Sequence, residues 1–286
     1  MKPQPSGGFE WVQAAGGPAL VCGALRPFAD HLYTTRDWAL GSRAEAADED
    51  WEPVAASLGV DSAHLARVHQ VHGNTVFTVR LKADATTDAT QVRLKPDATA
   101  DATQVRLKPD ATTDADIIVS NDPSIALAIQ VADCVPLLMA DRLTGAVAAA
   151  HAGWRGLAAG VPGATVAALT REFESRPSDL VVAIGPCISA AAYEVGDDVR
   201  ASFACAGGSA DHLARWFRNG NRAGHWSFDL WQAARDQLEG AGVPAAQIHL
   251  SALCTAGYPG LLCSYRREGK GAGRIAAAIR CASPRP

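Results

Sequence analysis

The chain has 286 residues, of which 48% are hydrophobic and 20% charged, so it can bury a sizeable core as one large domain or two small ones. Its formal net charge of -4 argues against a protein that mainly coats nucleic acid or an anionic membrane, because either function needs a dense basic surface. We therefore expect small-molecule ligands, with no nucleic-acid or membrane partner.

The first predicted elements are two strands, FEWV and ALVCGAL, joined by a turn at Gly16, Gly17 and Pro18. The same turn cuts the apolar run below the length of a signal or membrane segment.

The seven cysteines have no regular spacing, which is not typical of a disulfide framework and suits a reducing compartment. The expected protein is cytoplasmic and has free thiols.

Three near-copies of a 13-residue unit follow from Val79 to Asp116: VRLKADATTDATQ, VRLKPDATADATQ and VRLKPDATTDAD. The period is too short for the common helical solenoids, and each copy offers only one Val and one Leu to a core. Residues 79–116 are therefore predicted to be an exposed, mobile insertion with transient strands at each VRLK.

Outside the insertion, apolar runs of strand length alternate with segments of helical spacing. The strands are predicted over 125–134, 135–140, 145–151, 179–185 and 274–280, and the helices over 44–59, 157–175, 195–207 and 228–242. Strands arrive both as hairpins and as strand-helix-strand units. The predicted fold class is therefore α+β, a single-domain sandwich of mixed β-sheets flanked by helices that spans residues 1–286.

The chemically informative stretch is VADCVPLLMADRLTGAVAAAHAGWRG, residues 131–156. If Ala140 faces Gly145 across a four-residue loop, Cys134 lies opposite His151 on one face of an antiparallel hairpin. Such a pair can ligate zinc, form a thiolate–imidazolium nucleophile, or be a buried structural cysteine beside a hydrogen-bonded histidine. Asp133 and the glycines of HAGWRG provide the polar setting that suits a functional site.

The motifs QVHG, ADCVP and HAGWRG, followed by GPCI, YEVG, CT and SYRR, resemble those of the YfiH family, also called the laccase-domain or multicopper polyphenol oxidase-like family. The resemblance covers residues 32–280 apart from the repeats. It implies that His72, Cys134 and His151 bind one zinc ion and form the catalytic centre. It also implies phosphorolysis of adenosine, inosine, guanosine and methylthioadenosine, together with deamination of adenosine.

The other histidine of VHQVHGNTV, His69, is predicted to lie outside the metal site. On an extended strand, residues three apart point to opposite faces, so His69 and His72 would not share one ion. Gln70, on the face of His72, is a candidate for substrate contact.

Two arginines in family-like motifs, Arg36 in LYTTR and Arg155 in HAGWRG, are candidates for binding phosphate or a sugar-linked anion. Arg266 and Arg274 in SYRREGKGAGR are further candidates. Arg267 and Lys270 are instead expected on the solvated face of a C-terminal hairpin.

Three protein ligands leave a fourth zinc position for water or substrate, as in catalytic zinc sites. Copper is less favoured, because coupled oxidation of phenols needs several coppers and the eight histidines include no HxH pair. The leading hypothesis is a monomeric or homodimeric zinc enzyme that acts on purine nucleosides and phosphate. The alternatives are a cysteine hydrolase that edits amide bonds in cell-wall precursors, a copper-dependent polyphenol oxidase, and a non-enzymatic protein in which zinc is structural and the repeats form the working surface.

Overall fold

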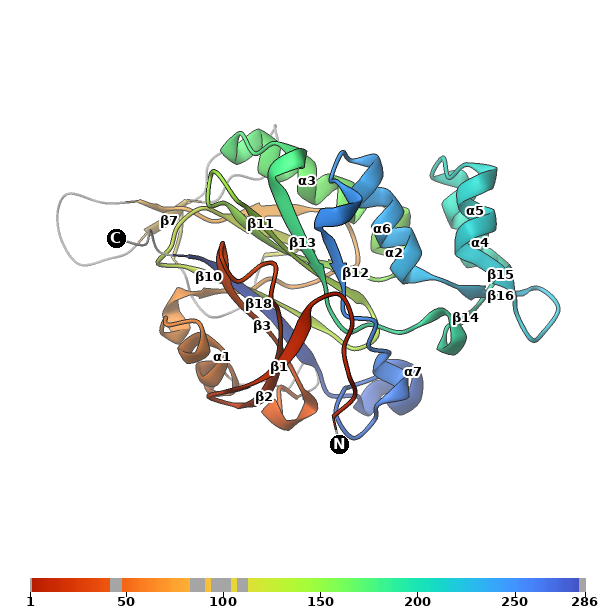
Figure 1. The fold of residues 1–286 in the computed structure, drawn as a ribbon, viewed down its shortest axis with the longest axis horizontal. Helices are drawn as coiled ribbons and strands as arrows, with labels where there is room; N and C mark the ends of the chain where they lie inside the picture. The colour runs from red at the N-terminus through yellow and green to blue at the C-terminus, as the bar shows by residue number, and fades with distance from the viewer. Residues whose placement is uncertain (1, 42–47, 83–90, 94–103, 107–112, 283–286) are drawn as a thin grey trace.

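Two six-stranded sheets form the body of the protein in a computed structural model that describes residues 2–41, 48–82, 91–93, 104–106 and 113–282 (Figure 1). The first sheet has the order β1 (Phe9–Ala14), β2 (Gly17–Cys22), β3 (Ala29–Thr34), β18 (Ile275–Cys281), β10 (Ala126–Val131) and β4 (Leu65–Ala66). The second has the order β17 (Ile248–Leu250), β13 (Leu180–Ile184), β11 (Val135–Asp141), β12 (Val147–Ala152), β9 (Ile117–Ser120) and β5 (Val76–Thr78). Each sheet is mixed, because β4 pairs with β10, β17 with β13 and β5 with β9 in parallel, whereas the other pairs are antiparallel.

The facing sides of the two sheets share one apolar core, since alternate residues of each strand point inward. Ile129 on β10 and Ile279 on β18 belong to the same buried cluster as Leu138 on β11. Tyr33 on β3 ties the sheets together, because its buried hydroxyl donates a 2.8 Å hydrogen bond to the Ala183 carbonyl on β13.

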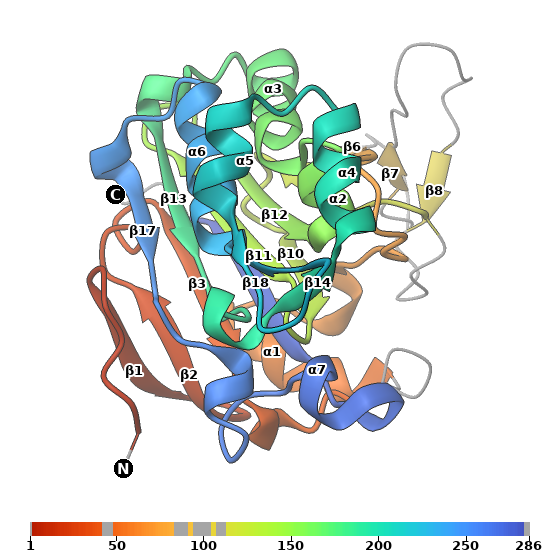
Figure 2. The ribbon, with the colours of Figure 1, turned by 90° about the vertical axis from the view of Figure 1, so that its right-hand side faces the viewer.

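Helices cover the outer faces of this sandwich. The seven helices of the described chain are α1 (Glu52–Ser57), α2 (Trp154–Ala158), α3 (Val161–Phe173), α4 (Asp197–Cys205), α5 (Ala210–Trp216), α6 (Leu230–Gly240) and α7 (Tyr265–Glu268). Helices α3 and α6 cover the second sheet (Figure 2), and α1 lies against the first (Figure 1). Their apolar residues belong to the same buried clusters as residues of those sheets. The predicted α+β sandwich of mixed sheets flanked by helices is confirmed.

Some predicted elements differ from the observed ones. The single helix expected over 157–175 is broken into α2 and α3, because Gly160 adopts a left-handed φ of 76° and Pro162 follows it at the start of α3. The prediction of a C-terminal hairpin around Arg267 is also wrong, since α7 occupies this segment. The small sheet of β14 (Glu194–Gly196), β16 (His225–Phe228) and β15 (Phe217–Asn219) was not predicted.

One short strand overlaps each VRLK segment: β6 (Leu81–Lys82), β7 (Gln91–Arg93) and β8 (Gln104–Arg106) form an antiparallel sheet beside the main body (Figure 2). The predicted limits of the insertion are wrong, because Val79, Ala115 and Asp116 are fully buried in the protein. Residues 83–90, 94–103 and 107–112 lie outside the described residues, so exposure and mobility of the repeats stay a prediction. Among the described helices, none is long and apolar enough to cross a membrane.

Candidate metal centre

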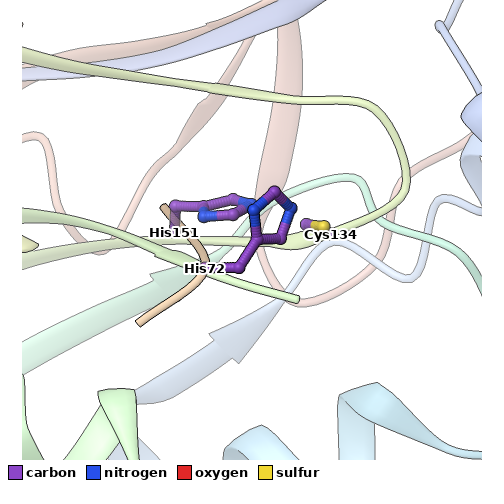
Figure 3. A group of neighbouring side chains, drawn as sticks. All are labelled: His72, Cys134 and His151. Atoms are coloured by element: carbon purple, nitrogen blue, oxygen red, sulfur yellow. The ribbon is translucent and has the colours of Figure 1, made fainter. Parts of the chain in front are cut away.

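The side chains of His72, Cys134 and His151 point toward one another (Figure 3). Their candidate ligand atoms lie within 4.8 Å of one another, and the two imidazole centroids are 4.8 Å apart with the ring planes at 85°. Within the described part of the chain, this is the one group of three His, Cys, Asp or Glu side chains arranged to hold a metal ion. One sulfur and two imidazole nitrogens form a donor set that suits zinc.

The hairpin of β11 and β12 positions two of the three side chains. His151 is paired with Pro136, so the predicted pairing of Cys134 with His151 is wrong by two residues. The turn lies one residue later than expected, because the Asp141 amide donates to the Ala146 carbonyl and so closes the loop. A shift of two residues keeps side chains on the same face of a strand, so Cys134 still meets His151 as a diagonal neighbour.

His72 comes from a loop and not from the predicted strand, since β5 begins only at Val76. Its φ of 63° lies in the left-handed region, which residues other than glycine seldom adopt. His69 lies outside the metal group, and its Nδ1 is 2.6 Å from Asp114 Oδ1 in an exposed pair. The separation of the two histidines therefore comes from the loop and not from strand alternation.

Asp116 is the site residue that sequence reasoning missed. It is fully buried, and its Oδ1 lies 2.7 Å from His151 Nδ1 and accepts a 3.0 Å hydrogen bond from the His72 amide. The repeat sequence could have indicated the importance of Asp116, because this residue stands where the first two copies have Thr90 and Thr103. The first two copies agree at this position and the third departs from them, which indicates that Asp116 serves the surrounding protein.

The triad opens into a cavity of about 500 Å³ that also includes Gln70 and Arg155 in its lining. Gln70 is buried, and its side-chain amide exchanges two 2.8 Å hydrogen bonds with the backbone of Gln130. Arg36 lies outside this cavity and forms a 2.7 Å ion pair with Glu268. Of the three predicted substrate contacts, Arg155 is the one that lines the cavity with a side chain not already hydrogen-bonded or ion-paired to another described residue.

The cavity is lined by three arginines and three aromatic residues: Arg155, Arg266, Arg274, Trp154, Tyr193 and Tyr265. The Arg155 guanidinium lies 4.2 Å from the Trp154 ring centroid, and that of Arg266 lies 4.8 Å from the Tyr193 ring centroid. Among the described residues, no carboxylate forms an ion pair with any of the three arginines. The cavity therefore suits an anionic ligand with an aromatic part.

Asp133 is the acidic residue in the cavity lining, and both of its oxygens are engaged. Oδ1 accepts a 2.5 Å hydrogen bond from the Thr255 hydroxyl, and Oδ2 accepts a 2.6 Å hydrogen bond from the Arg266 amide. The carboxylate thus holds the C-terminal segment that carries Arg266 against the cavity.

The cysteine and histidine of the hairpin have opposite pKa shifts. Burial alone would raise the pKa of Cys134, but the charges and hydrogen bonds of His151 and His72 outweigh it and lower that pKa to about 6. Burial would lower the pKa of His151, but the Cys134 thiolate and Asp116 raise it to about 9. At neutral pH the metal-free site therefore holds a thiolate beside an imidazolium.

Alkylation of the metal-free protein by iodoacetamide should reach half its maximal rate at Cys134 near pH 6, because the thiolate is the nucleophile and the pKa of Cys134 is about 6. Mass spectrometry of the Cys134 peptide across pH measures this rate, with the exposed Cys205 as internal comparison. Bound metal should protect Cys134. A profile for Cys134 that follows that of Cys205 would contradict the assigned ion pair.

Residues 33–282 match the family described as "Multi-copper polyphenol oxidoreductase laccase". A purine nucleoside phosphorylase of Deinococcus radiodurans is 32% identical over 262 residues, which cover 87% of this chain and 88% of that protein. One from Bacteroides thetaiotaomicron is 38% identical over 164 residues, which cover 57% of this chain and 60% of that relative. This second match thus spans less than two thirds of the relative's length.

Solved structures show the same fold. YlmD from Geobacillus stearothermophilus superposes with a TM-score of 0.75 at 28% identity, covering 96% of this chain and 99% of that one. YfiH from Bacillus licheniformis also gives a TM-score of 0.75, at 24% identity over 92% of this chain and 96% of that one. Because the family match extends over most of the sequence, the chain belongs to the YfiH family, which is also called the laccase-domain family.

Proposed function

We propose that the protein is a zinc-dependent enzyme that phosphorolyses adenosine, inosine, guanosine and methylthioadenosine and deaminates adenosine. The observation that carries this proposal is the opening of the His72, Cys134 and His151 group into a cavity whose arginines have no carboxylate partner among the described residues. Relatives named purine nucleoside phosphorylase support a nucleoside and phosphate as the substrates.

Zinc fits the donor set better than the several coppers of a polyphenol oxidase. Multicopper oxidation needs more than one copper site, whereas the described residues offer a single group of one sulfur and two imidazoles. A zinc ion held there by His72, Cys134 and His151 would supply Lewis-acid charge and a nucleophilic water at neutral pH.

The protein groups around the cavity suit the rest of a nucleoside. Arg155 offers forked donors to a phosphate, which would attack the sugar carbon as the purine leaves. Arg266 adds positive charge beside it, while its Nη1 donates a 2.8 Å hydrogen bond to the Glu194 carbonyl. The rings of Trp154 and Tyr193 offer faces on which a purine can stack. Burial raises the pKa of Tyr193 to about 12, so its hydroxyl stays protonated and can donate a hydrogen bond to the substrate.

Incubation of the purified protein with each nucleoside, with and without phosphate, tests the proposal. Chromatography should show release of free base only when phosphate is present, and ammonia and inosine from adenosine in either condition. Absence of every product from protein that carries stoichiometric zinc would reject a nucleoside substrate.

Replacement of Arg155 by alanine should raise the KM for phosphate, and kcat/KM for phosphorolysis should fall about 10- to 100-fold, as expected when a hydrogen-bonded charge pair is lost. Deamination of adenosine, which needs no phosphate, should change less than about 3-fold. Arg171→Ala is the matched control, because this exposed arginine lies on α3 and pairs with Glu172. Equal losses in both reactions would contradict a phosphate-binding role for Arg155.

A second candidate activity is cysteine-dependent hydrolysis of amide bonds in cell-wall precursors. It is favoured by the thiolate–imidazolium pair of Cys134 and His151 and by Asp116, which orients the imidazole as the acid of a Cys-His-acid arrangement does. In this reaction metal-free protein would cleave a muropeptide amide and added zinc would inhibit it. Zinc-stimulated turnover of nucleosides with no amide cleavage would exclude the hydrolase.

A further inference from the structure

The buried carboxylate of Asp116 accepts hydrogen bonds from three successive backbone amides beside the metal centre. Gly73 N lies 2.6 Å and Val71 N 3.3 Å from Oδ2, and His72 N lies 3.0 Å from Oδ1. Successive amides that converge on one point form an anion-binding nest. In this protein the anion in the nest is the chain's own carboxylate, which is fully buried.

The nest holds the turn that presents His72 to the site. The left-handed φ of 63° at His72 is unfavourable for a residue with a Cβ, and the surrounding contacts must stabilise it. Hydrogen bonds from residues 71, 72 and 73 to Asp116 supply that stabilisation. The position of the His72 ring therefore depends on Asp116.

The same carboxylate fixes the second imidazole. Its Oδ1 lies 2.7 Å from Nδ1 of His151, which places a proton on Nδ1 and leaves Nε2 to face the other ligands. The main chain reinforces the link, because the His151 amide donates a 2.8 Å hydrogen bond to the Asp116 carbonyl. One residue thus joins two ligands that are far apart in the sequence.

We propose that Asp116 is the positioning residue of the metal centre, which holds His72 and His151 in their binding geometry and so sets the affinity of the site for zinc. The inference rests on metal binding by the three side chains and is independent of the reaction proposed above. In Asp116→Asn, one carboxylate oxygen becomes an NH₂ group that faces N–H donors. Because outer-shell partners of metal ligands typically contribute about 10- to 100-fold in affinity, zinc should bind this variant weaker by that factor.

Competition with a chromophoric chelator, on the full-length protein and without nucleoside, measures zinc affinity at a temperature where circular dichroism shows each variant folded. Asp141→Asn is the matched control. Asp141 is also buried and accepts hydrogen bonds from two backbone amides, those of Leu143 at 2.7 Å and Thr144 at 3.1 Å, but it lies at the far end of the β11–β12 hairpin. Asp141→Asn should bind zinc within about 2-fold of the wild type, since it touches none of the ligands.

Cobalt provides a spectroscopic check on geometry, because the thiolate-to-metal charge-transfer band of the Co²⁺-loaded protein should weaken or shift in Asp116→Asn and stay unchanged in Asp141→Asn. An unchanged zinc affinity in Asp116→Asn, or an equal loss in both variants, would overturn the proposal.

A measurement on the wild type decides the matter if Asp116→Asn does not fold. Nitrogen-15 NMR of the histidine side chains in the zinc-loaded protein should show the His151 proton on Nδ1 and the metal on Nε2. A proton on Nε2 would overturn the proposal.

Discussion

Replacing Cys134 by serine should remove zinc from the protein and lower nucleoside turnover by more than about 10³-fold, since even an outer-shell partner contributes about 10- to 100-fold and we propose this residue as a direct ligand. Its thiolate is the one anionic group of the three ligands, and its pKa of about 6 makes it available at neutral pH. A serine hydroxyl remains protonated there and is a poor zinc ligand.

Cys205→Ser is the control for this substitution, because Cys205 is exposed at the end of α4 and lies outside the cavity. Zinc content by elemental analysis and nucleoside turnover should both be those of the wild type in the control. Retention of stoichiometric zinc together with activity in Cys134→Ser would show that the cysteine is not a ligand.

Gly153 is not one of the proposed ligands, but replacing it by alanine should disrupt the metal centre. A Cβ at this position would lie 2.9 Å from Cys134 Sγ and 3.3 Å from His72 Cδ2, so at least the sulfur must move. A displacement approaching 1 Å at a reacting centre typically costs about 10²-fold in rate, and we expect losses of this size in nucleoside turnover. Zinc affinity should fall in the same variant.

Gly163→Ala is the matched control for that prediction. Gly163 lies within α3, and a Cβ there would meet nothing within 4 Å. Alanine in a helix is more favourable than glycine by about 1 kcal/mol, so this variant should keep its zinc and unfold at an equal or higher temperature. If both alanine variants keep full zinc affinity, the close packing of Gly153 against the ligands is not required for the centre.

The β11–β12 hairpin could be predicted from the sequence because local signals define it. Apolar runs flank a polar turn, and strand alternation places Cys134 and His151 on one face whether or not the pairing is shifted by two residues. The exact turn could not be predicted, since Asp141 is the last strand residue and not the first of the loop. The predicted register differs from the observed one by two residues, and a shift by an even number leaves Cys134 and His151 on the same face.

The contribution of Asp116 could not be recovered in the same way. Its contacts join a loop at His72, the start of β9 and the end of β12, which meet only when the second sheet is assembled. Composition assigned Asp116 to the repeat, although its departure from the repeat pattern marked it. Likewise, Arg36 belongs to a family-like motif, but its ion pair with Glu268 depends on a segment more than two hundred residues away.

The proposed metal centre holds a single zinc ion between one imidazole from a loop and a thiolate and imidazole from a hairpin. X-ray absorption at the zinc edge of the purified protein measures these ligands. We predict one sulfur at about 2.3 Å and two imidazole nitrogens at about 2.0 to 2.1 Å in the first coordination shell. A shell that contains only nitrogen and oxygen would exclude Cys134 as a zinc ligand.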